Sequence, residues 1–199
     1  MDVTESQLSA IAENLSEIIE KRGYVYIKAN GNSMNPWIKP GSILRVERFN
    51  RDHQTGSIVL LNQKSTFLIH RVINQNNNCI LTKGDNLLCN DGPCDETKII
   101  GSVSEITFPN GSKYSLSENQ LPTSTIVKIS RVTNVCYMAS RDFALQLETW
   151  SGKVISPIIS RTIFQVASPF IVLRISRVLQ TFLRFHYLIK QKVVFVNGK

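Results

Sequence analysis

The stretch Gly31-Asn32-Ser33-Met34-Asn35-Pro36-Trp37-Ile38-Lys39-Pro40-Gly41 lies between two strand-like runs, Tyr24–Lys28 before it and Ile43–Val46 after it. Its opening Gly-Asn pair tolerates backbone angles that other residues resist, and its two prolines fix the exit. The stretch is therefore a turn that connects two β-strands. It carries a serine, Ser33, whose chemistry depends on what the rest of the chain brings to it.

Short strand-like runs continue beyond this turn, with polar connections such as Asn74–Asn78 and Pro109–Gly111 between them. The predicted strands are Tyr24–Lys28, Ile43–Val46, Ser57–Leu61, Thr66–Ile73, Cys79–Thr82, Ile99–Phe108 and Lys113–Leu116. Many short strands with close turns favour an antiparallel, partly closed fold over an α/β fold. We therefore expect a mainly β core with an N-terminal helix and a C-terminal helical extension.

A helix is predicted before the first strand. Thr4-Glu5-Ser6-Gln7 has the pattern of a capping box, and Gly23 is suited to end the helix. One helical face is apolar and consists of Leu8, Ile11, Leu15, Ile18 and Ile19. The helix is amphipathic and too polar to span a bilayer, so we expect it to pack against the sheet.

The pattern changes after Pro122. Apolar residues then recur at helical spacing, which predicts one or two helices from residue 123 to about 149. A basic amphipathic helix is predicted from about Phe170 to Lys190. Its polar face carries Arg174, Arg177 and Arg184. The expected organisation is an N-terminal helix (1–23), a β catalytic domain (24–118) and a helical basic extension (119–199).

The net charge of +8 is unevenly distributed. Eight basic residues and no acidic residue follow Glu148, so residues 1–148 hold 15 basic and 15 acidic residues and are neutral. A neutral body argues against a broad nucleic-acid surface. The four cysteines have neither zinc-like nor redox-like spacing, so we expect reduced thiols and no metal or other cofactor.

Partners for Ser33 occur downstream. Leu68-Ile69-His70-Arg71-Val72 supplies a histidine, and the run from Lys83 to Asp91 supplies two aspartates. A serine hydroxyl needs a base to take its proton, and a carboxylate can fix the tautomer of a histidine base. Neighbours on a strand point to opposite faces, so His70 can face Ser33 while Arg71 faces away. The residues alone do not choose between Asp85 and Asp91 for the carboxylate.

The order Ser33-Met34-x-Pro36, then His70-Arg71-Val72, then Lys83-Gly84-Asp85-Asn86 with Asp91 beyond, resembles signal peptidase I over roughly residues 24–106. It is most similar to the archaeal and endoplasmic-reticulum branch, which uses histidine where the usual bacterial branch uses lysine. The resemblance implies a β-rich catalytic core with Ser33 as nucleophile and His70 as general base. It also implies that Asp91 orients the histidine and that Asp85 supports the site. Trp37 and Ser42 depart from the family pattern.

Two features of the site stay open. The backbone N–H of Ser33 is the candidate oxyanion donor, assisted by Asn32. Lys64 and Lys83 leave room for a serine–lysine dyad, which needs a lysine desolvated enough to be neutral. Neither lysine lies in an apolar block of sequence, so a histidine base is favoured. His53 and His186 lie outside the motifs.

The expected function is a serine endopeptidase that cleaves a leader or signal segment from an extended peptide or preprotein. The alternatives are a non-catalytic or self-cleaving regulator on the same β core, and a cytosolic leader peptidase for a ribosomally made peptide. A regulator needs a DNA-binding domain, and only 23 residues precede the first strand. The N-terminus has no secretory signal pattern or family-type anchor. We expect a cytoplasmic protein or peripheral attachment to an anionic membrane through residues 170–190. The alternative for this helix is docking on the protein's own apolar helices.

Overall fold

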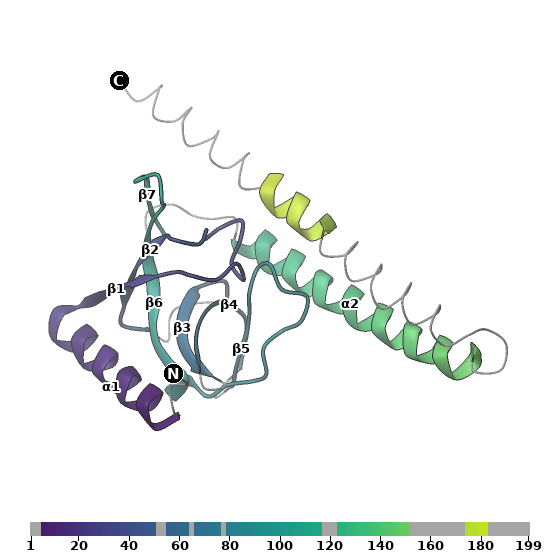
Figure 1. The fold of residues 1–199 in the computed structure, drawn as a ribbon, viewed down its shortest axis with the longest axis horizontal. Helices are drawn as coiled ribbons and strands as arrows, with labels where there is room; N and C mark the ends of the chain where they lie inside the picture. Colours follow the sequence, from purple (N-terminus) through teal and green to yellow (C-terminus); the bar gives the residue numbers. More distant parts are fainter. Residues whose placement is uncertain are drawn as a thin grey trace, which may run out of the picture.

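The computed structural model describes residues 5–50, 55–63, 66–76, 79–116, 123–151 and 174–182. In chain order the elements are α1 (Glu5–Arg22), β1 (Tyr24–Lys28), β2 (Ile43–Glu47), β3 (Ile58–Gln63), β4 (Thr66–Asn76), β5 (Cys79–Lys83), the 3-10 turn η1 (Glu96–Lys98), β6 (Ile99–Thr107), β7 (Lys113–Ser115) and α2 (Thr123–Ser151). Residues 174–182 form a further helical segment. Figure 1 shows α1 beside the β core and α2 leading away from it.

All strand pairs are antiparallel and belong to one sheet in the order β1-β2-β6-β3-β4-β5, with β7 added on β6. Register shifts interrupt the pairs β2–β6, β3–β6 and β4–β5. Such irregularities bend a strand and increase its twist, which lets the sheet curl around its core. The predicted mainly β antiparallel fold is confirmed. The sheet stays open, because no ladder among the described strands joins β1 to β5.

The sheet is buried on both faces at its centre. On β3, Ile58 and Leu60 belong to one apolar cluster, whereas Val59 and Leu61 belong to another. The first cluster also contains Ile19 of α1, so the predicted packing of this helix against the sheet is confirmed. Side chains alternate across a strand, so an unbroken apolar run is what a strand covered on both faces requires.

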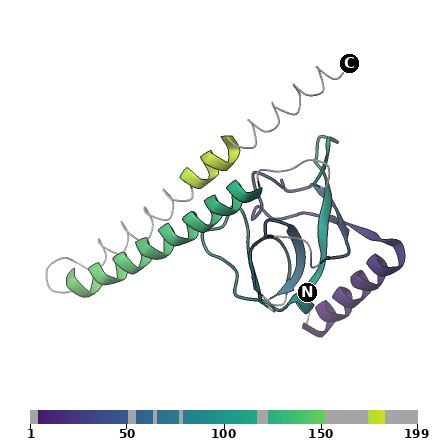
Figure 2. The ribbon, with the colours of Figure 1, turned by 180° about the vertical axis from the view of Figure 1, so that it is seen from behind.

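The sequence between Thr123 and Ser151 forms one helix. Its first turns bury Ile126 and Val127, and Figures 1 and 2 both show segment 174–182 alongside its first half. The hydroxyls of Thr133 and Ser176 meet there at 3.1 Å. Among the described residues, no helix combines the length and apolar character needed to cross a membrane. The rest of the predicted tail helix lies outside the described residues, as does Thr4 of the predicted capping box.

Candidate active site

The loop that carries Ser33 is closed at its base and anchored from within. Ala29 N–H donates to Ser42 O at 2.8 Å, and Gly41 N–H donates to Ala29 O at 2.6 Å. Gly41 has a positive φ of 83°, a conformation that an L-residue adopts only with strain. Met34 and Ile38 point into the core cluster next to the sheet. The loop is therefore a fixed platform, and Ser33 itself is partly exposed on it.

A second turn, Gly84–Asn86, lies directly against this loop. Asn86 N–H donates to Ser33 O at 2.7 Å, and the Asn86 side-chain Nδ2 donates to Asn32 O at 3.0 Å. A Cβ atom on Gly84 would lie 2.8 Å from Ser33 O, closer than real Cβ contacts allow. Glycine at this position therefore permits the two turns to touch.

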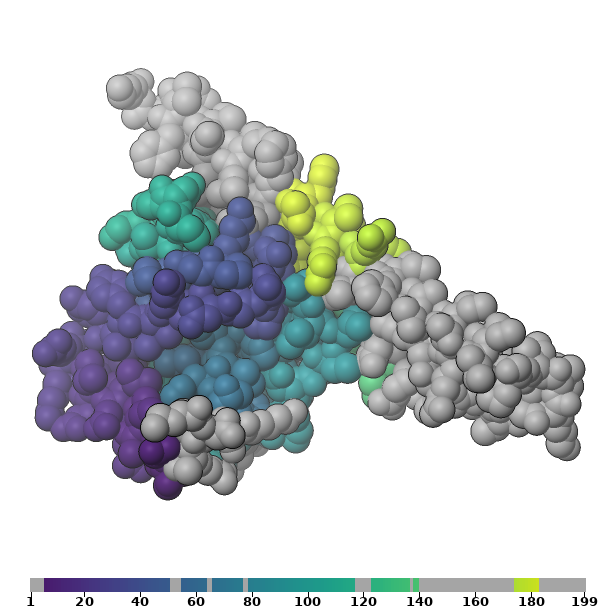
Figure 3. Space-filling view, in the orientation of Figure 1, coloured from purple at the N-terminus to yellow at the C-terminus, as the bar shows by residue number. Residues whose placement is uncertain are grey.

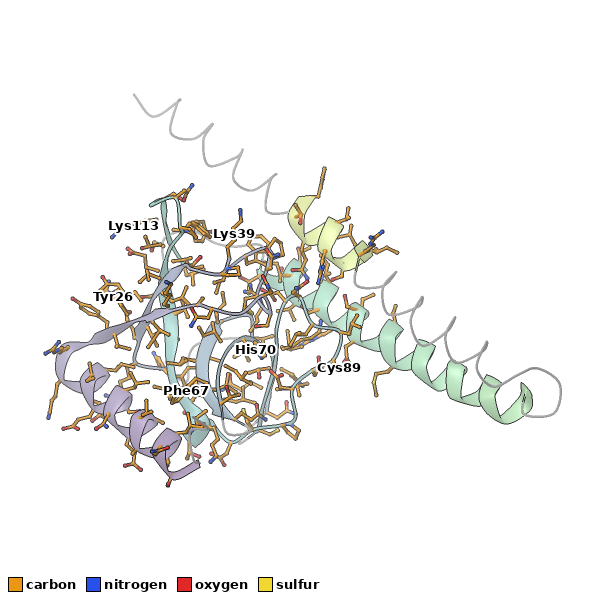
Figure 4. The ribbon with its side chains drawn as sticks, viewed as in Figure 1. Tyr26, Lys39, Phe67, His70, Cys89 and Lys113 are labelled. Carbon is orange, nitrogen blue, oxygen red and sulfur yellow. The ribbon has the colours of Figure 1, made fainter. Side chains whose placement is uncertain are left out.

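His70 lies on β4 and is buried, with its side chain 3% exposed. Its Nδ1 lies 2.6 Å from Asp91 Oδ2, and the same oxygen accepts a hydrogen bond of 2.7 Å from Thr82 Oγ1. A carboxylate at Nδ1 holds the ring so that Nε2 carries the free lone pair. This is the arrangement that a histidine base needs. Figure 4 shows His70 inside the β core and Cys89 on the loop toward α2.

Asp85 does not contact His70. Its carboxylate receives two hydrogen bonds from Arg71, from Nε at 2.9 Å and from Nη2 at 2.7 Å, while Arg71 Nη1 donates to Gly56 O at 2.8 Å. Both side chains of the pair are fully buried. The two candidate carboxylates therefore have different partners, because adjacent residues of β4 point to opposite faces of the sheet.

Lys83 is buried, although it does not lie in an apolar block of sequence. Its side chain is fully buried, and Nζ donates to Ser130 O of α2 at 3.1 Å. Burial lowers the pKa of Lys83 to about 8, although the nearby acidic groups of Asp85, Cys89 and Asp91 act in the opposite direction. The sequence did not reveal this burial because α2 covers Lys83 from 47 residues away. Lys64, the other candidate lysine, lies outside the described residues.

The Ser33 side chain and backbone N–H form no hydrogen bond with any described residue, so the structure contains no Ser33–His70 bond. The structure does bring together the residues that contact Ser33 and His70, because they belong to one segment of the chain. The segment from Thr82 to Asp91 contacts His70 through Asp91, which Thr82 holds, and contacts Ser33 through Asn86. In free enzymes the catalytic hydrogen bonds are often long and tighten only around substrate, so the geometry keeps both residues as candidates.

Sequence reasoning missed several residues that hold this segment. Thr82 was not singled out, nor were the contacts from α2, where Asn134 Oδ1 accepts from Asn90 N at 3.1 Å. Gln63 Nε2 donates to Gly92 O at 3.0 Å just beyond Asp91. Only the alternation of β5 could have suggested Thr82, since its side chain points to the face opposite Lys83. All four cysteines are free thiols. Within the described part of the chain, no cluster of three or more His, Cys, Asp or Glu side chains could hold a metal ion.

The sequence was compared with known families and proteins. The family model described as Peptidase S24-like matches residues 2–104, just over half of the 199 residues. The matched region contains α1, the Ser33 loop, the His70–Asp91 pair and most of β6. The comparison with curated proteins gave no match.

Proposed function

The chain belongs to the Peptidase S24-like family, and on that premise we propose that it is a serine endopeptidase of signal-peptidase type. In this proposal Ser33 is the nucleophile, His70 the general base and Asp91 the carboxylate that orients the base. The substrate is an extended peptide or preprotein from which a leader is removed. Family membership supports the peptidase-like fold, and the finer assignment rests on the His70–Asp91 pair and the Ser33 loop.

The buried His70–Asp91 pair is the observation that carries the proposal. A buried histidine without a catalytic role can be satisfied by one ordinary hydrogen bond. Here His70 Nδ1 lies 2.6 Å from Asp91 Oδ2, and Thr82 Oγ1 donates to the same oxygen at 2.7 Å. Burying a carboxylate is costly unless it is paired and hydrogen-bonded. An orienting group of this kind is what a histidine base requires to accept a serine proton and to remain stable as an imidazolium.

The proposed reaction follows the ordinary acyl-transfer sequence. Ser33 Oγ attacks the peptide carbonyl while its proton passes to Nε2 of His70, and the charged ring is stabilised by Asp91. His70 then gives the proton to the departing amine, and water releases the acyl group by the same path. The N–H of Ser33, which has no acceptor among the described residues, lies on a fixed loop and serves as an oxyanion donor in this scheme.

The substrate is proposed to lie along the edge strand β1, which leads directly into the Ser33 loop. Among the described strands β1 pairs only with β2, so its other edge is the place for an added strand. Pairing with a strand edge supplies affinity through main-chain hydrogen bonds. This mode of binding suits an extended leader segment.

A serine-reactive fluorophosphonate probe tests the nucleophile. The parent chain is expected to form one covalent adduct, located at Ser33 by mass spectrometry of the digested protein. Ser33→Ala should abolish both the adduct and the cleavage of leader peptides. Ser42→Ala is the matched control in the same loop, because the Ser42 hydroxyl is buried without a partner among the described residues. Full cleavage by Ser33→Ala would remove the enzyme proposal.

The base is tested by comparing His70 with Lys83. A buried lysine with a pKa of about 8 has a neutral fraction near neutral pH, so a serine–lysine dyad is a specific rival. We expect His70→Ala to lower the probe-labelling rate by about 10³-fold or more, whereas Lys83→Met lowers it by less than about tenfold. The reverse order would assign the base to Lys83 and exclude the histidine branch.

We also propose that the protein works at an anionic membrane surface. Segment 174–182 directs its polar residues Ser176 and Gln180 toward the protein, while four large apolar side chains stay exposed: Ile175, Val178, Leu179 and Phe182. Amphipathic helices usually direct their apolar face to a core, so an exposed apolar face indicates another contact. The basic charge beyond Glu148 favours anionic lipid as that contact.

Co-sedimentation with vesicles tests this location. The chain should sediment with vesicles that contain phosphatidylserine at low salt and should be partly released at high salt. Phe182→Ser should weaken the sedimentation, whereas Tyr26→Ser, an exposed aromatic residue on β1, should not. Equal behaviour of the two variants, or no sedimentation of the parent, would contradict the lipid contact.

A further inference from the structure

Segment 174–182 contacts the same turn that holds the Ser33 loop. Gln180 is fully buried, and its Nε2 donates to Asp85 O at 2.9 Å. Arg177 Nε donates to Asn86 Oδ1. These contacts join residues 91 and 95 positions apart in the chain. In Figure 3 the segment, drawn in yellow, lies against the coloured surface of the β core.

Asn86 connects this segment to the nucleophile. The oxygen of its side-chain amide accepts from Arg177, and the nitrogen of the same amide donates to Asn32 O at 3.0 Å. An amide that rotates by half a turn would exchange these atoms and direct its oxygen toward the Asn32 carbonyl, which cannot donate. Arg177 therefore fixes the orientation in which Asn86 can hold the Ser33 loop.

Gln180 fixes the backbone of the turn in a similar way. The side-chain carboxylate of Asp85 is held by the Arg71 ion pair, and its backbone carbonyl accepts the hydrogen bond from Gln180. Gln180 is itself held by Ser176, whose Oγ lies 3.3 Å from Gln180 Nε2 and within hydrogen-bond reach of Thr133 on α2. The turn is thus supported by a chain of polar contacts that begins on α2.

We propose that Arg177 and Gln180 are positioning residues of the peptidase site, acting through Asn86 and Asp85 on the Ser33 loop. The inference rests on the proposed function. Neither residue lies in the region matched by the family, which ends at residue 104. Misplacing a reacting group by about 1 Å costs on the order of 10²-fold in rate. Loss of either contact is expected to slow acylation of Ser33 by about 10- to 100-fold.

The rate and the amplitude of Ser33 labelling separate positioning from a merely structural role. Arg177→Ala and Gln180→Ala should label slowly but to full amplitude, because every folded molecule keeps its nucleophile. In peptide cleavage kcat should fall while KM changes little, and the pH profile should keep its shape because the base is untouched. Arg177→Lys, which retains one donor, should recover part of the rate. Arg174→Ala is the matched control, since it removes the same charge from an exposed side chain with no hydrogen bond to the described residues.

The possible results separate the positioning role of Arg177 and Gln180 from the proposed peptidase activity. Normal labelling of the parent with unchanged rates in both variants overturns the inference and leaves the peptidase standing. Faster labelling in the variants also overturns it and makes segment 174–182 an inhibitory cover. Reduced amplitude at an unchanged rate shows partial unfolding and contradicts positioning. Failure of the parent to label at Ser33 removes the proposed function and this inference with it.

Discussion

Replacing Lys83 with methionine should change how the stability of the protein depends on pH. Lys83 is fully buried, and among the described residues its ammonium group has a single hydrogen-bond acceptor, Ser130 O. Burial lowers its pKa from 10.5 to about 8. Each pKa unit corresponds to about 1.4 kcal/mol, so keeping Lys83 charged in the folded state costs about 3 kcal/mol. Methionine has a similar length and carries no charge.

The sign follows from the protons bound in each state. Below about pH 8 Lys83 is protonated in both the folded and the unfolded protein, and the folded state bears the full cost. Between about pH 8 and 10.5 the folded protein has released the proton while the unfolded chain still binds it. The unfolded state binds more protons in this window, so the free energy of unfolding rises with pH. The parent should therefore gain about 2 to 3 kcal/mol relative to Lys83→Met between pH 7 and pH 10.

Urea unfolding at pH 7 and pH 10 measures this difference, with the fluorescence of buried Trp37 as the probe. Other groups titrate in parent and variant alike and cancel in the comparison. At pH 7 the variant should be at least as stable as the parent, because the lost desolvation cost outweighs or balances the loss of one hydrogen bond to Ser130 O. The control is Lys128→Met, which removes an exposed lysine of α2 and should follow the parent. Parallel changes in Lys83→Met and the parent across this pH range would refute the reasoning.

Three further predictions concern the segment from Gly84 to Asp91. Asp91→Asn should lower the rate of Ser33 labelling by about 10³- to 10⁴-fold, because a neutral amide no longer stabilises the imidazolium. The urea midpoint should change little. Equal labelling rates in variant and parent would reject Asp91 as the orienting group. Asp85→Asn should instead destabilise the protein by about 3 to 5 kcal/mol in the same unfolding assay, since it leaves Arg71 charged and unpaired in the interior. Gly84→Ala should slow labelling, because its Cβ would press on Ser33 O at 2.8 Å, and an unchanged rate would mean that the two turns need not touch.

Much of the fold could be predicted from local pattern. The strands from Tyr24 to Ser115 alternate or form apolar runs between turns, so their positions agree with the prediction to within three residues. The predicted helix after Pro122 is also confirmed and extends to Ser151. The predicted strand ended at Ile73, where polar residues begin. In the structure β4 continues to Asn76, because its last residues still pair with β5. Local pattern says where strands are, and pairing decides where they stop.

The site was only partly readable for the same reason. His70 and Asp91 stand in motifs, and their contact follows from the way β4 and β5 pair. The catalytic roles of these residues stay predictions. The partner of Asp85 depends on which face of β4 carries Arg71, and the burial of Lys83 depends on a helix that begins 40 residues later. Contacts of this range leave no periodicity in the sequence.

The predicted boundary near residue 118 separates strands from helices along the chain, but the contacts of the site cross it. Lys83 donates to α2, and α2 in turn anchors β4, where Arg131 Nη2 donates to Ile73 O at 2.7 Å. The Asp85–Asn86 turn is held by segment 174–182. Each of these contacts satisfies a buried or half-buried polar group, and losing such a partner costs about 1 to 3 kcal/mol. A chain without α2 would expose the Lys83 ammonium to water, which removes its desolvation and returns its pKa toward the ordinary value for lysine. The helices beyond the family match therefore help to set the pKa of Lys83 and the position of the Asp85–Asn86 turn, which holds the Ser33 loop.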